Sequence, residues 1–433
     1  MPDEPQTLET AAPAADRASS PATTVGDSPA PAPPGVWIAR LVVVGLVLAA
    51  LNLRPAITSL GALLEEVRDG LHMSGSVAGV LTSVPPLCFA IFGITAPRLA
   101  RRFGPAAVVC AGMAAIFAGL AVRPFASGTV GFLAASALAL MGIAVSNVLM
   151  PVIVKRYFPD RVGTMTGLYS MALALGTSLA AAATVPMTEA LGGGWRTGLG
   201  LWAVLAAFAV LPFVPLLRDR GTHSAAPTPA VPAQGAAPAP PLRITRSRTA
   251  WALGAFFGLQ ATGAYITMGW MPQIFRDAGV PAGTAGVLLA VTMVMGVPLA
   301  FVIPRLATRL KNQGPIAVAL ALCGLTGYTG LYLAPAAGAW AWALLLGVSN
   351  CAFPLALTMI GMRSRTGAGV VRLSAFAQSV GYLISIPGPL LVGVLYQHSG
   401  GWGLPIALMA GLMLPQMAVG VLAGRDRTVE DEC

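Results

Sequence analysis

The stretch FLAASALALMGIAVSNVLMPVIV, Phe132 to Val154, is continuously apolar. A helix needs roughly 20 apolar residues to cross a bilayer, and a transmembrane barrel would instead show segments of about 10 residues with alternating polarity. The whole chain is similarly apolar: its 433 residues are 56% hydrophobic and only 10% charged, with a mean hydropathy of +0.76. The sequence therefore predicts an all-α polytopic membrane protein.

Apolar runs separated by short polar loops fill the chain from Trp37 to Gly424. Twelve spans are expected, and an even number places both termini on one side of the membrane. The expected spans are Trp37 to Leu60, Ser76 to Pro97, Pro105 to Val122, Thr129 to Val154, Gly163 to Met187, Thr197 to Leu217, Ala250 to Phe275, Gly283 to Ile303, Pro315 to Ala334, Ala339 to Met362, Gly369 to Gln397 and Gly403 to Ala423.

Loop charge predicts the orientation. Most of the 26 basic residues fall in the tails and in loops on the same side, whereas the opposite side carries only Arg68, Arg123, Arg196 and Arg276. Since cytoplasmic loops are enriched in Lys and Arg, both termini are expected in the cytoplasm and the protein in the inner membrane. The net charge of +10 then needs no nucleic acid to explain it, and no basic and aromatic platform for nucleic acid is evident.

Composition and repeats divide the chain. Residues 1–35 predict a disordered tail, 218–248 a Pro/Ala-rich cytoplasmic linker and 425–433 a second tail, which leaves six-span halves at 36–217 and 249–424. The halves repeat: AGVL at 78–81, PRLA at 97–100 and GGW at 193–195 recur at one common offset in the second half, and SNVLMP at 146–151 corresponds to SNCAFP at 349–354, which pairs Asn147 with Asn350. Six spans per half make the halves parallel repeats, the arrangement of the two bundles of major facilitator transporters, in which the substrate site lies near the midplane between them.

Several motifs also carry a family resemblance, and they extend over nearly all of the chain outside the tail and linker. From Leu51 to about Ala423 the sequence resembles the cyanate/2-nitroimidazole transporter (CynX/NimT) branch of the major facilitator superfamily. The motifs are LNLRPAITSLGALL (51–64), APRLARRFG (96–104), GIAVSNVLMPVIVKRYFP (142–159), GTMTGLYS (163–170), GGWR (193–196) and LSAFAQSVGYLISIPGPLLVG (373–393). This resemblance implies two pseudo-symmetric six-helix bundles that move a small polar, anionic or nitroaromatic solute by alternating access.

Arg54 is the one charge that lies well inside an expected span, since Arg40 and Arg372 fall within three residues of the start of theirs. It lies 14 residues after Arg40, about 21 Å along a helix, which puts it in the outer half of a core of about 30 Å. One interpretation is that Arg54 snorkels to the external headgroups, aided by Pro55. The favoured one is that it faces a central cavity and pairs with an anionic or strongly dipolar solute, because none of the 16 acids lies well inside a span to serve as its partner.

Other polar and aromatic side chains on the spans are weaker candidates for the solute site. Each has helix packing or an interfacial belt as its alternative role. The pair Gln378 and Tyr382 shares one face at i, i+4. The candidates are Asn52, Asn147, Tyr169, Gln260, Tyr265, Trp270, Asn350, Gln378 and Tyr382.

The missing acids also constrain the mechanism. Proton-coupled transporters normally hold a carboxylate or histidine within the membrane, so uniport, exchange or proton movement carried by the solute is favoured. Glu65 and Glu66 are the acids nearest to a membrane-embedded position, and they are expected to form a solvated helix end.

The five scattered cysteines and three loop or linker histidines predict no metal, cofactor or enzyme chemistry. We expect a monomeric secondary transporter in the lipid bilayer. Drug or metabolite efflux, and a receptor or scaffold that has lost transport, remain alternatives.

Overall fold

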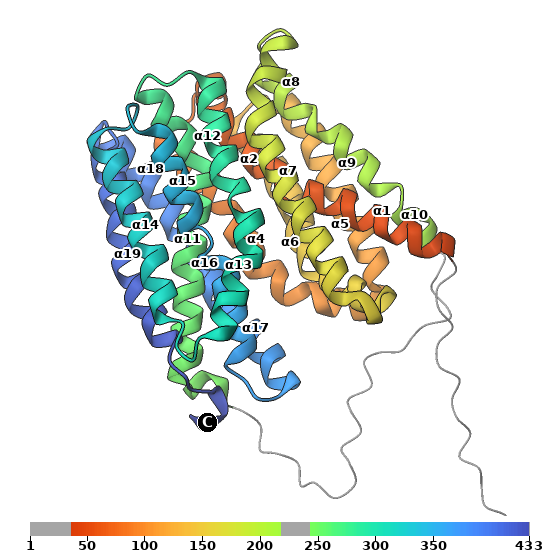
Figure 1. Ribbon diagram of the computed structural model, residues 1–433. Helices are drawn as coiled ribbons and strands as arrows, with labels where there is room; N and C mark the ends of the chain where they lie inside the picture. Colours follow the sequence, from red (N-terminus) through yellow and green to blue (C-terminus); the bar gives the residue numbers. More distant parts are fainter. Residues whose placement is uncertain (1–35, 218–242, 433) are drawn as a thin grey trace, which may run out of the picture.

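The computed structural model describes residues 36–217 and 243–432, and within them it contains helices and turns but no strand (Figure 1). The expected tail at 1–35 and residues 218–242 of the expected linker lie outside the described residues. The first half contains α1 (Val36–Asn52), α2 (Pro55–Ala62), α3 (Leu64–Gly70), α4 (Gly75–Phe103), α5 (Pro105–Val122), α6 (Thr129–Tyr157), α7 (Val162–Ala190), α8 (Trp195–Gly200), α9 (Trp202–Val210) and α10 (Phe213–Leu216).

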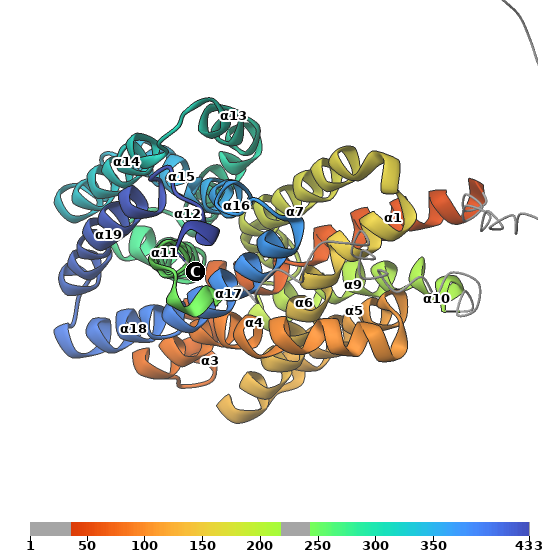
Figure 2. The same ribbon diagram turned by 90° about the horizontal axis from the view of Figure 1, so that it is seen from below.

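The second half begins with the long helix α11 and continues with eight shorter helices. Figure 2 shows most of these helices gathered on one side of the molecule, with α5, α6, α7 and α9 on the other. They are α11 (Arg248–Asp277), α12 (Ala282–Val294), α13 (Gly296–Arg309), α14 (Gly314–Leu333), α15 (Ala339–Ser349), α16 (Ala352–Met362), α17 (Gly367–Ser385), α18 (Pro387–Ser399) and α19 (Gly403–Ala423).

Ten helical stretches in the described residues are long and apolar enough to cross a membrane. They coincide with ten of the twelve expected spans. The sixth expected span falls on α8, α9 and α10, whose apolar part Trp195–Val210 is shorter, and the seventh falls on α11, a helix of 30 residues. The all-α membrane architecture is therefore confirmed, while the count of twelve stays a prediction.

Prolines explain two of the places where an expected span is broken. Pro55 begins α2 directly after the turn that ends α1, and Pro387 begins α18 after α17. A proline has no N–H to donate, so the helical hydrogen-bond ladder is interrupted at the ring and a new helix starts there. The tenth expected span is also divided, at Asn350 and Cys351 between α15 and α16.

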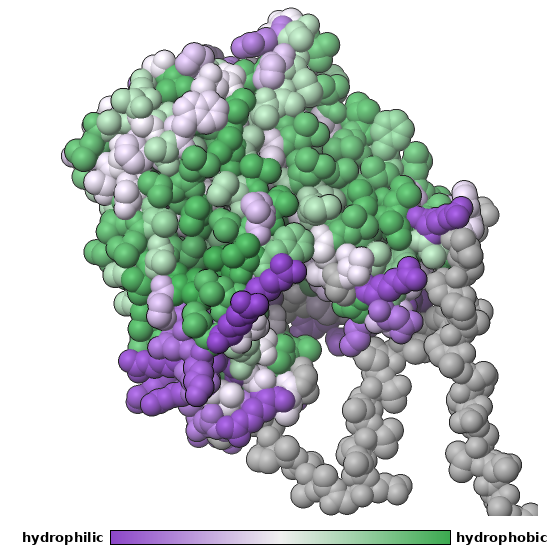
Figure 3. Space-filling model, viewed as in Figure 1, coloured by the Kyte–Doolittle hydropathy of each residue, from purple (hydrophilic) through white to green (hydrophobic). Residues whose placement is uncertain are grey.

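The outer surface of the helices is apolar. Figure 3 shows hydrophobic residues over the sides of the molecule and hydrophilic ones gathered at one end. Leu175, Leu211 and Leu383 are each more than half exposed, as expected for side chains that face lipid. We call the end where α1 begins and α19 finishes the tail end, and the opposite end, where α8 lies in Figure 1, the far end.

The two halves meet mainly along four pairs of helices: α2 with α11, α4 with α17, α4 with α18, and α7 with α12; α11 also contacts α3 and α4. Small residues allow the backbones to approach closely. A Cβ built on Gly393 of α18 would lie 2.4 Å from the carbonyl oxygen of Gly75 and 2.8 Å from the Cα of Gly79 on α4. Membrane helices associate through such close packing, since lipid supplies no hydrophobic force between them.

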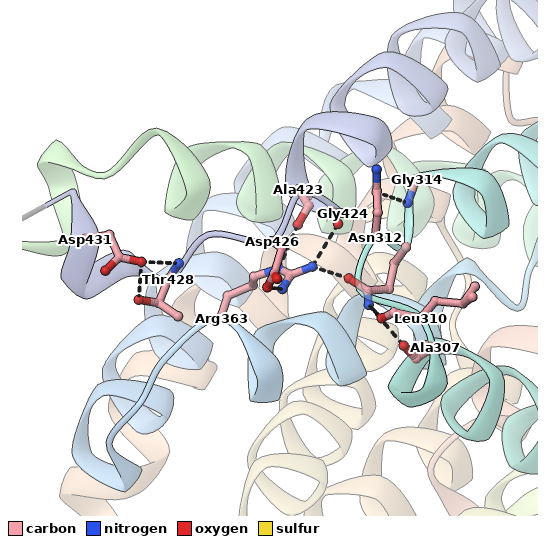
Figure 4. A network of polar contacts seen from close by, with 11 residues as sticks. Ala307, Leu310, Asn312, Gly314, Arg363, Ala423, Gly424, Asp426, Thr428 and Asp431 are labelled. Carbon is pink, nitrogen blue, oxygen red and sulfur yellow. Dashed lines mark hydrogen bonds and ion pairs between the residues drawn. The ribbon is translucent and has the colours of Figure 1, made fainter.

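Arg363 stabilises the tail end of the second half. The loop count assigns it to the expected cytoplasmic side and carries no information on burial, and its side chain is 2% exposed. Its guanidinium donates to the carbonyls of Ala423 (3.2 Å) and Gly424 (2.8 Å) and to the Gln313 side chain, as Figure 4 shows. Gln313 in turn donates to the Ala307 carbonyl at 3.0 Å, so the network joins α13, α14, α16 and α19.

Replacing Arg363 with alanine is expected to destabilise the protein by about 2–4 kcal/mol, because it leaves the Ala423 carbonyl and the Gln313 amide oxygen without the guanidinium donor, while the Gly424 carbonyl keeps the Gln313 N–H at 3.0 Å. Thermal unfolding in detergent measures this. Arg365→Ala is the matched control: its ion pair with Asp431 joins side chains that are 65% and 41% exposed. Such a pair contributes at most about 1 kcal/mol, so equal losses in the two variants would contradict the structural role of Arg363.

Candidate functional site

Arg54 stands at a break in the first membrane segment. Leu53 and Arg54 form the turn between α1 and α2, and Arg54 caps α2 with φ −128° and ψ −25°. Its carbonyl accepts hydrogen bonds from the N–H groups of Ile57 (2.9 Å) and Thr58 (3.1 Å). Non-helical backbone at this depth is tolerated only where it is enclosed by protein or lines a cavity. The side chain, half-buried, lies among helices of both halves.

Aromatic rings surround the guanidinium. Its carbon lies 5.9 Å from the centroid of the Phe89 ring, within cation–π distance. Phe89 stacks on Tyr382 with centroids 5.0 Å apart and lies 6.5 Å from Tyr265, and the charge of Arg54 acts on both phenols. Phe257 meets the other side of Tyr382 edge-on at 5.2 Å. We call Arg54, Phe89, Phe257, Tyr265 and Tyr382 the Arg54 cluster.

The cluster draws on both halves of the chain. Arg54 and Phe89 come from the α1–α2 junction and α4, whereas Tyr265 and Tyr382 come from α11 and α17. All three aromatic side chains are buried, with exposed fractions of 8% or less. A solute held here would touch both halves at once, as a site between parallel repeats requires.

Arg54 has no acidic partner among the described residues. The ion pairs of the described chain join Arg276 to Glu65 and Glu66, and Arg363 and Arg365 to acids of the C-terminal segment. A partly buried guanidinium without a counterion stays hydrated or pairs with an anion supplied from outside the protein. The planar fork of donors suits a small oxyanion, and the stacked rings suit a planar solute.

The structure places other predicted residues outside this cluster. Trp270 is fully buried and donates its indole N–H to the Thr82 hydroxyl at 3.2 Å, so it joins α11 to α4 towards the far end. Gln378 lies one turn from Tyr382 and donates to the Ser374 hydroxyl at 2.8 Å. Tyr169 is a half-buried ring against the apolar core.

The four amide side chains separate into different environments. Asn52 donates to the carbonyls of Leu48 (2.8 Å) and Leu205 (3.2 Å), which uses both of its amide hydrogens in helix packing. Gln260, Asn350 and Gln416 line a pocket inside the second half. Each of the three has a buried polar atom without a hydrogen-bond partner. Asn147 is half-buried on the unbroken α6, so its environment differs from that of its repeat counterpart Asn350.

Sequence patterning missed Phe89, Phe257 and Arg123. The two phenylalanines give no signal that separates them from ordinary core residues. Arg123 does: it precedes Pro124, and Arg54 precedes Pro55, at the end of an apolar run in both cases. The loop count assigns Arg123 only to the side of the membrane opposite the tails, and the structure buries its side chain to 1% exposure.

Comparisons with known proteins agree with this architecture. The sequence profile of the Major Facilitator Superfamily matches residues 42–385. The chain belongs to the major facilitator superfamily. It is 35% identical to the uncharacterized transporter YycB of Bacillus subtilis (89% of this chain, 94% of that protein). It is 32% identical to the 2-nitroimidazole transporter of Escherichia coli (90% and 96%) and 29% identical to the cyanate transport protein CynX of the same organism (85% and 94%).

Solved structures show the same fold at low sequence identity. The nucleoside transporter NupG superposes with a TM-score of 0.69 at 13% identity, over 89% of this chain and 98% of that one. A bacterial homologue of the lysosomal transporter Spinster, in an inward-facing conformation, gives 0.65 at 16% identity, over 90% and 95%. The resemblance to the cyanate/2-nitroimidazole branch and the major facilitator fold are thus confirmed.

This major facilitator protein is closed at its far end. Arg276 of α11 pairs with Glu65 (2.8 Å) and forms two contacts with Glu66 (2.9 and 3.0 Å), both on α3 of the other half. Nearby, the N–H and hydroxyl of Ser76 both donate to the Gln397 side chain, at 2.8 and 2.7 Å. The two glutamates, expected as a solvated helix end, therefore also serve as partners that join the halves.

Replacing Arg276 with alanine is expected to favour opening of the far end. An ion pair of this exposure contributes about 1 kcal/mol, which corresponds to a shift of roughly fivefold in the ratio of open to closed molecules. Spin labels at the exposed positions Val130 and Leu333 are introduced in a background without native cysteines. The distance between the two labels, measured by pulsed electron paramagnetic resonance, reports the separation of the halves. Arg196→Ala, an exposed far-end arginine that lies over Trp195, is the control. Identical distance distributions for Arg276→Ala and wild type would contradict this role.

Proposed function

We propose that this protein is a secondary transporter that moves a small polar, anionic or nitroaromatic solute across the inner membrane by alternating access. The observation that carries the proposal is the Arg54 cluster, a guanidinium without an acidic partner in the described residues, enclosed by aromatic rings from both halves. Arg54 would pair with the negative or electron-rich group of the solute, and Phe89, Tyr265 and Tyr382 would stack against its plane.

The relatives support this class of solute. One is named for 2-nitroimidazole, a planar nitroaromatic, and another for cyanate, a small anion. Both have an electron-rich oxygen or nitrogen that a guanidinium can hold, and this shared chemistry matches the charge of the cluster. A cyanate-like or nitroimidazole-like solute is therefore the proposed cargo.

The proposed topology places both termini in the cytoplasm and makes the tail end cytoplasmic. The concentration of Lys and Arg on that side supports it. Residues 36–217 and 249–424 would form the two moving bundles, and a monomer suffices because the Arg54 cluster is built within one chain. With the far end closed, the solute would enter or leave from the cytoplasm.

The proposed mechanism is uniport, exchange or proton movement carried by the solute itself. The acids that pair with arginines in the described residues lie at the two ends of the molecule, and none reaches Arg54. No embedded carboxylate is thereby available beside the solute to take up a proton during transport.

Transport assays in proteoliposomes test the proposal. Vesicles that contain the full chain are expected to take up labelled cyanate, 2-nitroimidazole or benzoate faster than empty vesicles. Exchange against the same solute inside should be at least as fast as net uptake, and a pH gradient should drive only solutes that carry a proton themselves. If none of the three solutes moves in either direction, the proposed function is wrong.

A further inference from the structure

Arg123 is a second buried guanidinium with unused donors. It ends α5 just before Pro124, and its side chain is 1% exposed. One nitrogen, Nη1, donates to the carbonyl of Ala56 at 3.2 Å, and the guanidinium lies 5.5 Å from the centroid of the Phe132 ring. Its Nε and Nη2 atoms are buried and have no hydrogen-bond partner. Leaving a buried charge unpaired is strongly destabilising, so these donors point to a missing acceptor.

Arg123 lines a narrow pocket that also contains a second unpaired donor. The hydroxyl of Ser136 on α6 is 1% exposed and lacks a partner. The Thr82 and Tyr265 side chains complete the polar part of the wall, and the remainder is apolar and comes from α2, α4, α6 and α11. No acidic side chain belongs to the lining, so the free polar groups of Arg123 and Ser136 suit a ligand that accepts hydrogen bonds.

The pocket adjoins the Arg54 cluster on its far-end side. Tyr265 belongs to both, and the Arg123 guanidinium is bonded to Ala56, two residues after Arg54. Along α4, Leu81 and Pro85 of the pocket precede Phe89 of the cluster by one to two turns. Tyr265 therefore borders both the Arg123 pocket and the Arg54 cluster.

We propose that Arg123 and Ser136 form a second subsite that binds the two oxygens of a planar nitro or carboxylate group of the transported solute, while Arg54 holds the face or the opposite end of the same molecule. This inference rests on the proposed function. The two unused N–H groups of Arg123 present the fork that pairs with a planar two-oxygen group, and the Ser136 hydroxyl adds a third donor. The apolar wall excludes water and strengthens these bonds.

Ligand-dependent thermal stability of the full chain in detergent tests the subsite, with benzoate as the carboxylate probe. Benzoate is expected to raise the melting temperature of the wild type, since a ligand that binds the folded state stabilises it. Arg123→Met should melt at or above the wild-type temperature without ligand, because an unpaired buried cation is removed, yet its benzoate affinity should fall by at least about tenfold. Ser136→Ala should lose about threefold. Ser178→Ala removes an equally unpaired buried hydroxyl outside the pocket and should bind as the wild type does.

The outcomes separate the subsite from the transport proposal. If Arg54→Ala loses benzoate binding while Arg123→Met retains it, the subsite is wrong and the transport proposal stands. If Arg123→Met melts well below the wild type and still binds benzoate, Arg123 has a structural role only. If benzoate, cyanate and 2-nitroimidazole all leave the wild-type melting temperature unchanged, the proposed function itself fails, and the subsite with it.

Discussion

Replacement of Arg54 with alanine is expected to lower the initial rate of solute uptake by about 100-fold. Removing one partner of an enclosed, hydrogen-bonded charge pair costs about 2–5 kcal/mol, and 3 kcal/mol corresponds to roughly two orders of magnitude in affinity. The described residues offer no second cation in contact with Phe89 that could replace it. Uptake of labelled cyanate or 2-nitroimidazole into proteoliposomes, at solute concentrations below half-saturation, measures the loss.

The lysine variant at Arg54 separates charge from geometry. Lysine keeps the positive charge but presents a compact ammonium in place of the planar fork, so Arg54→Lys should recover only part of the rate. Arg102→Ala is the matched control. Arg102 also lies over a phenylalanine ring, that of Phe103 at 5.1 Å, but it is exposed at the tail end. If Arg54→Ala transports as fast as Arg102→Ala, the guanidinium does not hold the solute.

The sequence was sufficient to identify Arg54 as unusual because the physical rule is local. A charge within an apolar run is costly wherever it lies, and counting acids along the chain shows that no partner is available within the spans. The sequence named Tyr265 and Tyr382 only as candidate solute-site residues on the expected spans and did not predict that they lie beside Arg54. Their stacking with Phe89 is a tertiary contact between α4, α11 and α17, and no sequence period reports it.

Arg123 and Arg363 show what the loop count leaves open. Each follows an apolar run and is counted on one side of the membrane, and the structure buries each side chain to at most 2% exposure. Positive-inside statistics concern the side of the membrane on which a residue lies and carry no information on burial. The Arg–Pro pair is the local signal that Arg123 shares with Arg54, since the proline ends or restarts a helix at the arginine.

The repeat between the halves did not predict that Asn147 and Asn350 have different local environments. The repeat placed them at corresponding positions, and they do lie on corresponding segments. However, α6 is continuous at Asn147, whereas the helix is interrupted at Asn350 and the amide turns into the pocket with Gln260 and Gln416. Short identities fix the correspondence of segments, but the breaks that orient side chains depend on packing within each half.

Replacement of Gly61 with alanine is expected to prevent the far end from closing. Gly61 of α2 faces α11 of the other half, and a Cβ built on it would lie 2.0 Å from the carbonyl oxygen of Met268 and 3.3 Å from the Cα of Gly269. Both are backbone atoms, so no side-chain rotation relieves the clash. Overpacking costs about 1–3 kcal/mol, which would shift the ratio of closed to open molecules by roughly 5- to 150-fold.

The Gly61→Ala effect should be visible in two measurements on the same protein. The label pair at Val130 and Leu333 should report a longer separation, and solute exchange should slow at least in proportion to the lost closed population, because alternating access requires both ends to close in turn. Gly93→Ala, a helical glycine of α4 with nothing within 4 Å of its built Cβ, is the control and should behave as wild type. A Gly61→Ala variant with wild-type distances and exchange rates would show that α2 and α11 do not need this close approach. The close contact between α2 and α11 would then have no role in the proposed transport cycle.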